Sequence, residues 1–383
     1  MNKGKEEKLM RINLKRIAAG VAAMVMGMSL AACGSSTVSS NGSDDNGAKQ
    51  EIETSTMSTK AAGMSTNANV PAAPEKPNYE NSLSGKVVVY MPSPSGLNKK
   101  YVEGFQKKTG VEVELYEGPS GEILARLEAE KDNPVADVVV LASWSDGLSM
   151  KQQDKIMAYT PYNADKMYDE WIDNDHTLFG TSASAVGVIY NTTIIDKLNA
   201  DWSELGDAKY ADDIAIPDPQ KSGSCKDFLA GYMCATNSNW SAFDKMAKVG
   251  LFNAGANKAA LSSVTTGEKA ILVAGVDYNA YSSMVKGEPI NIYYPKSGTV
   301  INPRPAMILK SSKNVDNAKA FVDYLLSDEA QKMVADAYLL PGRSDVKCTN
   351  RTNVSEIPTM KVDWDWMMKN SDDIAKKLVD MCK

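Results

Sequence analysis

The sequence is poor in the residues on which many catalytic and metal centres depend. Its 383 residues include a single histidine, His176. A zinc site built on imidazole groups needs several such ligands, and a Ser-His-Asp triad needs a histidine oriented by a carboxylate. The run from Asp173 to His176 is typical of a surface turn. We therefore expect neither a metal site nor catalytic residues of these kinds.

Motifs for nucleotide and acyl chemistry are also missing. The sequence contains no G-x-x-x-x-G-K-[ST] phosphate-binding loop and no G-x-S-x-G nucleophile elbow. Carboxylates are plentiful, but their pattern does not separate paired catalytic acids from a solvated surface. We expect no enzyme and no cofactor, and keep a surface enzyme as a remote alternative.

Clusters of lysine and arginine are absent after the first residues. The chain has 42 basic and 48 acidic residues, a net charge of −6. Residues 1–32 hold six of the basic and two of the acidic residues, so the remainder has 36 against 46, a net charge of −10. Because nucleic-acid binding depends on clustered Lys and Arg, we expect no nucleic-acid partner.

One uncharged stretch, residues 17–32, follows a basic head. It is shorter than the roughly 20 apolar residues of a spanning helix, and it ends in small residues, so we predict a signal peptide over 1–32. The ending Leu30-Ala31-Ala32-Cys33 resembles the bacterial lipobox, which implies that Cys33 is the lipid attachment site. An ordinary signal peptide followed by a chance cysteine is the alternative. We expect no other membrane-spanning segment.

Residues 33–84 are mostly Ser, Thr, Asn, Ala, Gly and Pro. A segment with so few large apolar side chains cannot offset its ordering entropy by burial. We predict a lipid-anchored flexible linker that holds the rest of the chain at the extracytoplasmic face of a membrane.

Four further cysteines leave the redox state open. Cys225 and Cys234 are expected on one helix, where nine residues rise about 13.5 Å, beyond the roughly 7 Å between Cα atoms that a disulfide allows. Cys348 and Cys382 could pair in an oxidising compartment. The alternative is that all four are buried thiols.

The remaining residues are enough for two lobes of an α/β fold. Apolar strands predicted at 86–90, 111–115 and 137–142 alternate with helices at 97–108 and 121–131. Nearly continuous apolar strands between helices are typical of a parallel sheet covered on both faces.

A second unit is predicted as an insertion in the first. Lobe 1 comprises residues 85–183 and returns over 298–383 with the C-terminal helices, and lobe 2 comprises 184–297. Expected strands at 290–294 and 306–310 lead the chain back. Two crossings between the lobes predict a hinge with an interdomain cleft.

The order of these segments resembles the ABC-transporter solute-binding proteins of the ferric-iron, thiamine, polyamine and phosphonate cluster, which share the type 2 periplasmic-binding fold. The segments that carry the resemblance are Val87–Tyr90, Gly118–Arg126, Asn133–Asp137, Gly187–Asn191, Ile216–Pro219 with Ser222–Ser224, Tyr294–Thr299, Asn317–Val322 and Asp363–Trp366. The resemblance implies a solute held in the cleft, permease subunits that recognise closure, and an ATPase in trans. We expect a monomer, with a signalling partner as the alternative to a permease.

Small hydroxyl residues and glycines follow the predicted strands, where ligands of open α/β sheets bind. Such loops open helices whose N-terminal N–H groups carry partial positive charge and bind phosphates or carboxylates. The candidate solute-binding residues are Ser93, Ser95, Ser120, Gly121, Ser143, Trp144, Ser182, Ser222, Gly223, Ser224, Asp277 and Tyr278. The resemblance supports the Ser222–Ser224 run as a solute contact. For Ser120 and Ser143 a helix N-cap is the alternative, and Trp144 could instead cover the sheet edge.

These loops favour a small anionic solute that bears a phosphate or phosphonate. Ferric iron is the second candidate, with Asp277 and Tyr278 as ligands, although the iron-binding relatives carry paired tyrosines there. A polyamine or thiamine is the third and would need carboxylates and aromatic rings. Arg304 could clamp an anion through two hydrogen bonds, or be a solvated hinge residue.

Overall fold

The computed structural model describes residues 79, 83–92 and 94–382 of the chain. The predicted signal peptide, the predicted lipid attachment site Cys33, most of the predicted linker and Ser93 lie outside the described residues. Within the described part, no helix is both long and apolar enough to cross a membrane.

Lobe 1 begins with three strands, each followed by a helix. These elements are β1 (Lys86–Met91), α2 (Ser95–Thr109), β2 (Glu112–Glu117), α3 (Ser120–Ala129), β3 (Val138–Val140) and α4 (Trp144–Gln152). Strand β1 lies between β2 and β3 and pairs with both in parallel. The predicted strand-helix alternation and the parallel pairing are confirmed.

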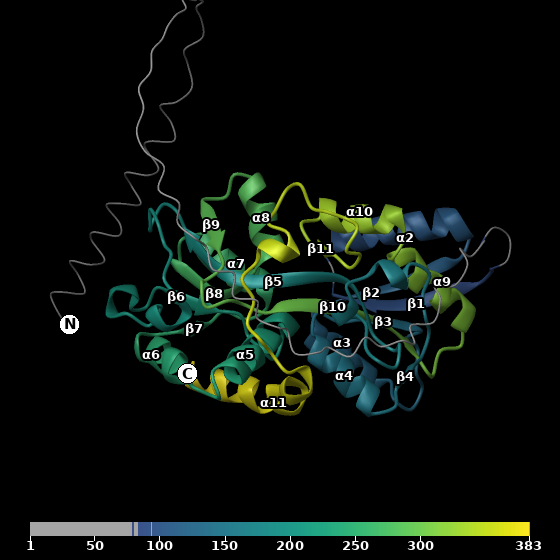
Figure 1. The fold of residues 1–383 in the computed structure, drawn as a ribbon, viewed down its shortest axis with the longest axis horizontal. Helices are drawn as coiled ribbons and strands as arrows, with labels where there is room; N and C mark the ends of the chain where they lie inside the picture. The colour runs from purple at the N-terminus through teal and green to yellow at the C-terminus, as the bar shows by residue number, and fades with distance from the viewer. Residues whose placement is uncertain (1–78, 80–82, 93, 383) are drawn as a thin grey trace, which may run out of the picture. The chain divides into compact units, whose positions relative to one another are not determined.

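Lobe 2 has a smaller sheet of its own. Its elements are β6 (Ile214–Ile216), α5 (Gly223–Ala235), α6 (Ser241–Lys248), β7 (Phe252–Asn253), α7 (Asn257–Thr265), β8 (Ile271–Val276), α8 (Asp277–Val285) and β9 (Ile290–Tyr293). Strand β6 pairs in parallel with β7 and β8. In Figure 1, this lobe occupies the left half of the folded part and lobe 1 the right half.

Two long strands, β5 (Phe179–Asn191) and β10 (Ile301–Leu309), connect the lobes. The first half of β5 pairs with β10 in lobe 1, and its second half pairs with β8 and β9 in lobe 2. The strands therefore form one hydrogen-bonded path that passes through both lobes. Of the two crossings, β5 pairs with strands of both sheets, whereas β10 pairs with β3, β4 and the first half of β5 in the sheet of lobe 1 (Figure 1).

The chain after β10 returns along lobe 1 and ends between the lobes. The return contains α9 (Val315–Leu325), α10 (Asp328–Asp336), β11 (Leu340–Pro341) and α11 (Trp364–Met381), while the short strand β4 (Ile156–Met157) precedes the hinge. Helix α11 packs against α5 of lobe 2 and α4 of lobe 1. The C-terminal helix thus contacts both lobes, although the sequence assigned it to lobe 1.

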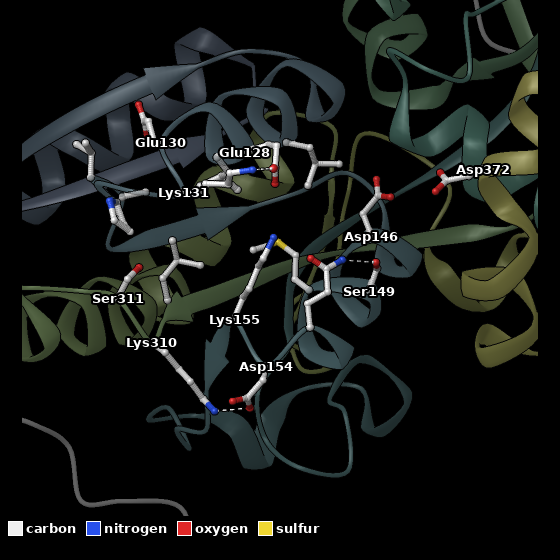
Figure 2. A pocket seen from close by; sticks show the side chains of 18 of the residues that line it. Glu128, Glu130, Lys131, Asp146, Ser149, Asp154, Lys155, Lys310, Ser311 and Asp372 are labelled. Atoms are coloured by element: carbon white, nitrogen blue, oxygen red, sulfur yellow. Dashed lines mark hydrogen bonds and ion pairs between the residues drawn. The ribbon is translucent and has the colours of Figure 1, made fainter.

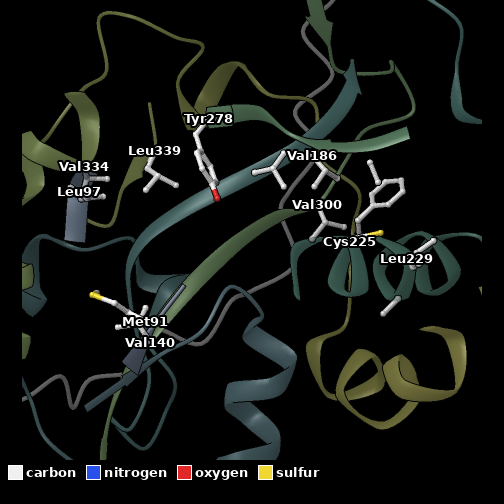
Figure 3. Packing of buried hydrophobic residues seen from close by; sticks show 14 of the residues in the cluster. Met91, Leu97, Val140, Val186, Cys225, Leu229, Tyr278, Val300, Val334 and Leu339 are labelled. Carbon is white, nitrogen blue, oxygen red and sulfur yellow. The ribbon is translucent and has the colours of Figure 1, made fainter. Parts of the chain in front are cut away.

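The main buried cluster continues from one lobe into the other. Figure 3 shows Met91, Leu97 and Val140 of lobe 1, Val186 and Val300 at the crossings, and Cys225, Leu229 and Tyr278 of lobe 2. Of the segment predicted as a linker, Tyr79 and Leu83 pack on this cluster. A shared core places the two halves of the cleft on one scaffold.

The cysteine and capping predictions have mixed outcomes. Cys225 and Cys234 lie on one helix, as predicted. All four described cysteines are free thiols, so the alternative of a Cys348–Cys382 disulfide is wrong for this structure. Ser120 is the first residue of α3 rather than its N-cap, which is Pro119.

Candidate functional site

A cleft with a volume of about 200 Å³ lies between the lobes. Lobe 1, lobe 2 and β10 all contribute side chains to its walls. The lining residues are Pro92, Pro94, Pro119, Ser120, Ala142, Lys221, Ser222, Gly223, Ala256, Asn257, Lys258, Tyr278, Asn279 and Arg304.

Five helices begin at this cleft. Pro94, Pro119, Ser222 and Ala256 are the N-caps of α2, α3, α5 and α7, and Tyr278 lies in the first turn of α8. The first N–H groups of a helix have no partner within the helix and carry partial positive charge. Their convergence makes the cleft a favourable place for an anion.

The floor of the cleft is polar and deeply buried. Arg304 on β10 is 1% exposed, and its guanidinium carbon lies 5.9 Å from the ring centre of Tyr278. Asn302, two residues earlier, faces the same side of the strand, and neither polar atom of its buried amide has a hydrogen-bond partner in the described structure. Ser184 lies opposite Asn302 on β5, and its buried hydroxyl also has no hydrogen-bond partner in the described structure. Asn302 and Ser184 are not among the residues that line the cleft, so Arg304 supplies the polar group of its floor.

The charges of the lining have one sign. Lys221 and Lys258 lie at the exposed margin and Arg304 at the floor. Among the described lining residues there is no aspartate or glutamate. The cleft is thus positive in a chain whose net charge is negative.

Asp277 is adjacent to the cleft and fully engaged. Its buried carboxylate accepts hydrogen bonds from the backbone N–H groups of Ala185 (3.0 Å) and Tyr278 (2.7 Å). It also pairs with Arg351 at 2.5 Å, and both side chains are buried. The hydrogen bond from Ala185 fixes the start of α8 against β5, and the ion pair fixes it to Arg351.

Ser222 organises the wall formed by lobe 2. Its hydroxyl accepts a hydrogen bond from the Cys225 N–H (3.2 Å) and donates one to Oδ1 of Asn257 (2.8 Å). Ser224 lies 3.2 Å away, oxygen to oxygen. With Oδ1 engaged, Asn257 offers its amide N–H groups as donors.

Ser143 and Trp144 take part in a contact between the lobes. Asp227 of α5 accepts hydrogen bonds from the Ser143 hydroxyl (2.9 Å) and the Trp144 backbone N–H (2.7 Å). Burial and, to a smaller extent, the nearby Asp146 together raise the pKa of Asp227 to about 7. The Trp144 ring packs beside Trp364 in the core of lobe 1. We call this contact, formed by Ser143, Trp144 and Asp227, the interlobe latch.

The lobes are in close contact around the cleft. Lys226 of α5 pairs with Asp146 of α4 at 2.6 Å. A Cβ atom on Gly223 would lie 2.9 Å from Cβ of Ser143, and one on Gly121 would meet the carbonyl oxygen of Gln220 in lobe 2. Glycine at these two positions therefore permits the approach of the lobes.

The predicted site residues separate into groups. Ser120, Ser222, Gly223 and Tyr278 line the cleft. Gly121 lines a neighbouring hollow, Ser182 pairs with Arg304 across the hinge strands, and Ser95 begins α2. Ser143, Trp144, Ser224 and Asp277 lie behind the lining in the contacts described above.

Sequence reasoning missed four polar lining residues. Lys221 precedes the recognised Ser222 run, and Asn279 follows Tyr278. Asn257 and Lys258 open α7 after β7, a strand of only two residues. Gly255, just before the start of α7, was the one local sign of a loop at this position. The strand β7 before it has only two residues, which is too short for an alternating pattern to reveal it.

A larger hollow, of about 500 Å³, lies on lobe 1 between α3 and α4 (Figure 2). Its charges have both signs and are largely paired at its rim. Lys131 pairs with Glu128 at 2.7 Å, and Lys310 pairs with Asp154. This hollow therefore lacks the single sign of charge found in the cleft.

The cleft does not present a set of metal ligands. Among the described residues, no group of three or more His, Cys, Asp or Glu side chains is arranged to hold a metal ion. Tyr293 donates its hydroxyl hydrogen to the Ala200 carbonyl, whereas the Tyr294 hydroxyl lies at Asp277. These adjacent tyrosines therefore lie in different environments.

The fold and cleft are those of a two-lobed solute-binding protein. The chain belongs to the bacterial extracellular solute-binding protein family, whose model matches residues 133–370.

Among its relatives, it is 25% identical over 287 residues to a putative 2-aminoethylphosphonate-binding periplasmic protein of Salmonella typhimurium, covering 72% of this chain and 82% of that protein. Among solved structures, it is similar to the fructose-6-phosphate-bound periplasmic binding protein AfuA from Actinobacillus pleuropneumoniae, with 22% identity, a TM-score of 0.70, and coverage of 78% and 98%. It is also similar to iron-bound HitA from Pseudomonas aeruginosa, with 19% identity, a TM-score of 0.68, and coverage of 76% and 99%.

Proposed function

We propose that this protein captures a small phosphate- or phosphonate-bearing solute in the cleft between its lobes and delivers it to an ABC importer. The observation that carries the proposal is the composition of the cleft. Five helix N-termini and three cationic side chains converge there, and the described lining residues include no carboxylate. Oxyanions bind well to such donors.

Solute capture would follow from the difference between open and closed lobes. A solute that contacts donors from both lobes and from Arg304 binds the closed form more tightly than the open form, and so shifts the hinge equilibrium. The glycines at 121 and 223 let the lobes approach while the solute occupies the space between them. Closure is then the signal that membrane subunits recognise.

The lining favours an anion over ferric iron as the transported solute. Iron would need several phenolate or carboxylate oxygens, but Tyr278 is the single tyrosine of the described lining. The adjacent carboxylate of Asp277 is already paired with Arg351. A polyamine or thiamine, being cationic, would meet Lys221, Lys258 and Arg304.

The partners proposed with this function are a permease and its ATPase in trans. A monomer anchored through Cys33 and a linker would stay close to such a permease. A receptor that reports solute to a signalling protein is the alternative to a permease partner.

Replacing Arg304 tests the proposal directly. The probes are 2-hydroxyethylphosphonate, glycerol phosphate, fructose 6-phosphate and ferric citrate, with affinities measured by calorimetry. We expect at least one phosphorylated or phosphonate probe to bind, and Arg304→Gln to weaken it by about 2–4 kcal/mol, because hydrogen bonds to charged groups are worth about 1.5–3 kcal/mol each.

Two control variants isolate the role of Arg304. Arg304→Lys keeps the positive charge but lacks the forked set of guanidinium donors. Its affinity for the solute should therefore lie between that of the wild-type protein and that of Arg304→Gln. Lys99→Gln removes an equal charge from exposed α2 and should change nothing. Binding of ferric citrate alone, or equal affinity in Arg304→Gln, would contradict the proposal.

A further inference from the structure

We infer that the solute of this cleft is an oxyanion that carries no ammonium group, so that the protein discriminates against aminoalkyl phosphonates and phosphates. This inference rests on the proposed function and specifies its substrate class. It follows from the charged side chains that line the cleft, all of which are cations, and from the hydrogen bonds and ion pairs that the nearby carboxylates already make.

The side chains that face the cleft are engaged in ways that leave donors for the solute. Ser120 accepts a hydrogen bond from the Ala142 N–H at 2.8 Å, which leaves its hydroxyl hydrogen to donate. Asn257 accepts from Ser222 through Oδ1, which leaves its N–H groups. Arg304, Lys221 and the N–H groups at the helix starts have no acceptor capacity. A bound ammonium would therefore meet donors like itself.

Three carboxylates close to the cleft are already engaged by donors of the protein. Asp277 pairs with Arg351, and Asp227 accepts from Ser143 and Trp144 in the interlobe latch. Asp218 accepts from the Gln220 N–H at 2.9 Å and lies 4.0 Å from the Lys221 ammonium. An ammonium would have to displace one of these partners.

The cleft is also small. Its volume is about 200 Å³. An ammonium on a short solute would therefore stay near one of the three cationic side chains Arg304, Lys221 and Lys258. Like charges at such separations disfavour binding.

The test compares solutes that differ in one group. The probes are 2-hydroxyethylphosphonate against 2-aminoethylphosphonate, and glycerol phosphate against ethanolamine phosphate, at pH 7 by calorimetry. We expect the wild-type protein to bind the hydroxyl member of a pair at least tenfold more tightly than the amino member.

A variant supplies the missing carboxylate. Asn257→Asp keeps an oxygen that accepts from Ser222 and places a second oxygen where the amide N–H groups were. We expect it to reduce the preference for the hydroxyl member at least tenfold. The control, Asn239→Asp, adds the same charge beyond the other end of α5. It keeps the side-chain oxygen that accepts a hydrogen bond from the Ser241 N–H. Its preference for the hydroxyl member should therefore equal that of the wild-type protein.

The outcomes separate this inference from the proposed function. Equal or tighter binding of the amino members by the wild-type protein overturns the inference and leaves anion capture standing. An unchanged preference in Asn257→Asp, with solute still bound, also overturns it. Binding of none of the four probes counts against both the proposed function and the inference.

Discussion

The N-termini of α4 and α5 look alike in sequence and differ in the structure. Each helix has a serine N-cap, Ser143 or Ser222, whose hydroxyl accepts a backbone N–H of the first turn. At α4 the Trp144 N–H is bonded to the carboxylate of Asp227. At α5 the cap faces the cleft, and the first turn contains no acidic residue.

This difference shows how a protein uses one local geometry for two purposes. A helix N-terminus attracts negative charge whatever its source. Where the other lobe supplies a carboxylate, the N-terminus holds the lobes together. Where it does not, the N-terminus is available to an anionic solute.

The largest effect is expected from titration of the latch. Burial raises the pKa of Asp227 to about 7 from its ordinary value of 3.8, and Asp146 adds to the shift while Lys226 opposes it. Below pH 4 the carboxyl is protonated in folded and unfolded chains alike. As the pH rises towards 7, only the unfolded chain ionises, so the folded state loses stability until its own pKa is reached.

Removing the titrating group should flatten this profile. Three pKa units correspond to about 4 kcal/mol. The free energy of unfolding is measured in urea between pH 4 and 7.5 for the wild type and for Asp227→Asn. Over this range, the value for the wild type should fall relative to that for Asp227→Asn by up to about 4 kcal/mol. A difference in stability that is the same at every pH does not affect this comparison. Parallel profiles for the two proteins would show that Asp227 does not titrate as the geometry requires.

The sequence could predict which loops bear helix N-termini but not which of them face the cleft. The strand-helix order follows from local periodicity, the hinge was predicted from the two chain crossings, and the Ser222–Ser224 run was proposed as a solute contact from the resemblance. The occupant of the α4 N-terminus, Asp227, is 83 residues from Trp144, and no local pattern connects them. Asp277 was predicted as a solute ligand because it follows a strand of lobe 2, and no local pattern indicates its partner Arg351, which is 74 residues away.

The approach of the lobes gives a second way to probe the comparison. Gly121→Ala places a methyl group against the Gln220 carbonyl of lobe 2. Because overpacking typically costs about 1–3 kcal/mol and this clash exists only when the lobes meet, the cost should appear as weaker solute binding. Calorimetry with the tightest phosphorylated or phosphonate probe measures it.

The matched control is Gly96→Ala, on α2 of the same lobe, where a Cβ atom meets nothing within 4 Å. It should leave affinity unchanged. If Gly121→Ala bound solute as tightly as Gly96→Ala, the binding-competent state would not require the lobe contact seen here.

The smallest expected effect separates the two serine caps. Ser143→Ala and Ser222→Ala each remove a helix cap worth about 1 kcal/mol, so urea unfolding should show similar losses of stability. Only Ser222→Ala also releases Asn257 from its oriented position in the cleft, so it should weaken solute binding by about 1 kcal/mol, which is about a fivefold change in affinity. Ser143→Ala leaves the Trp144 N–H bonded to Asp227 and does not alter the lining. Equal losses of affinity in the two variants would mean that the α4 and α5 N-termini act on the solute alike, and the distinction between latch and binding site would be wrong.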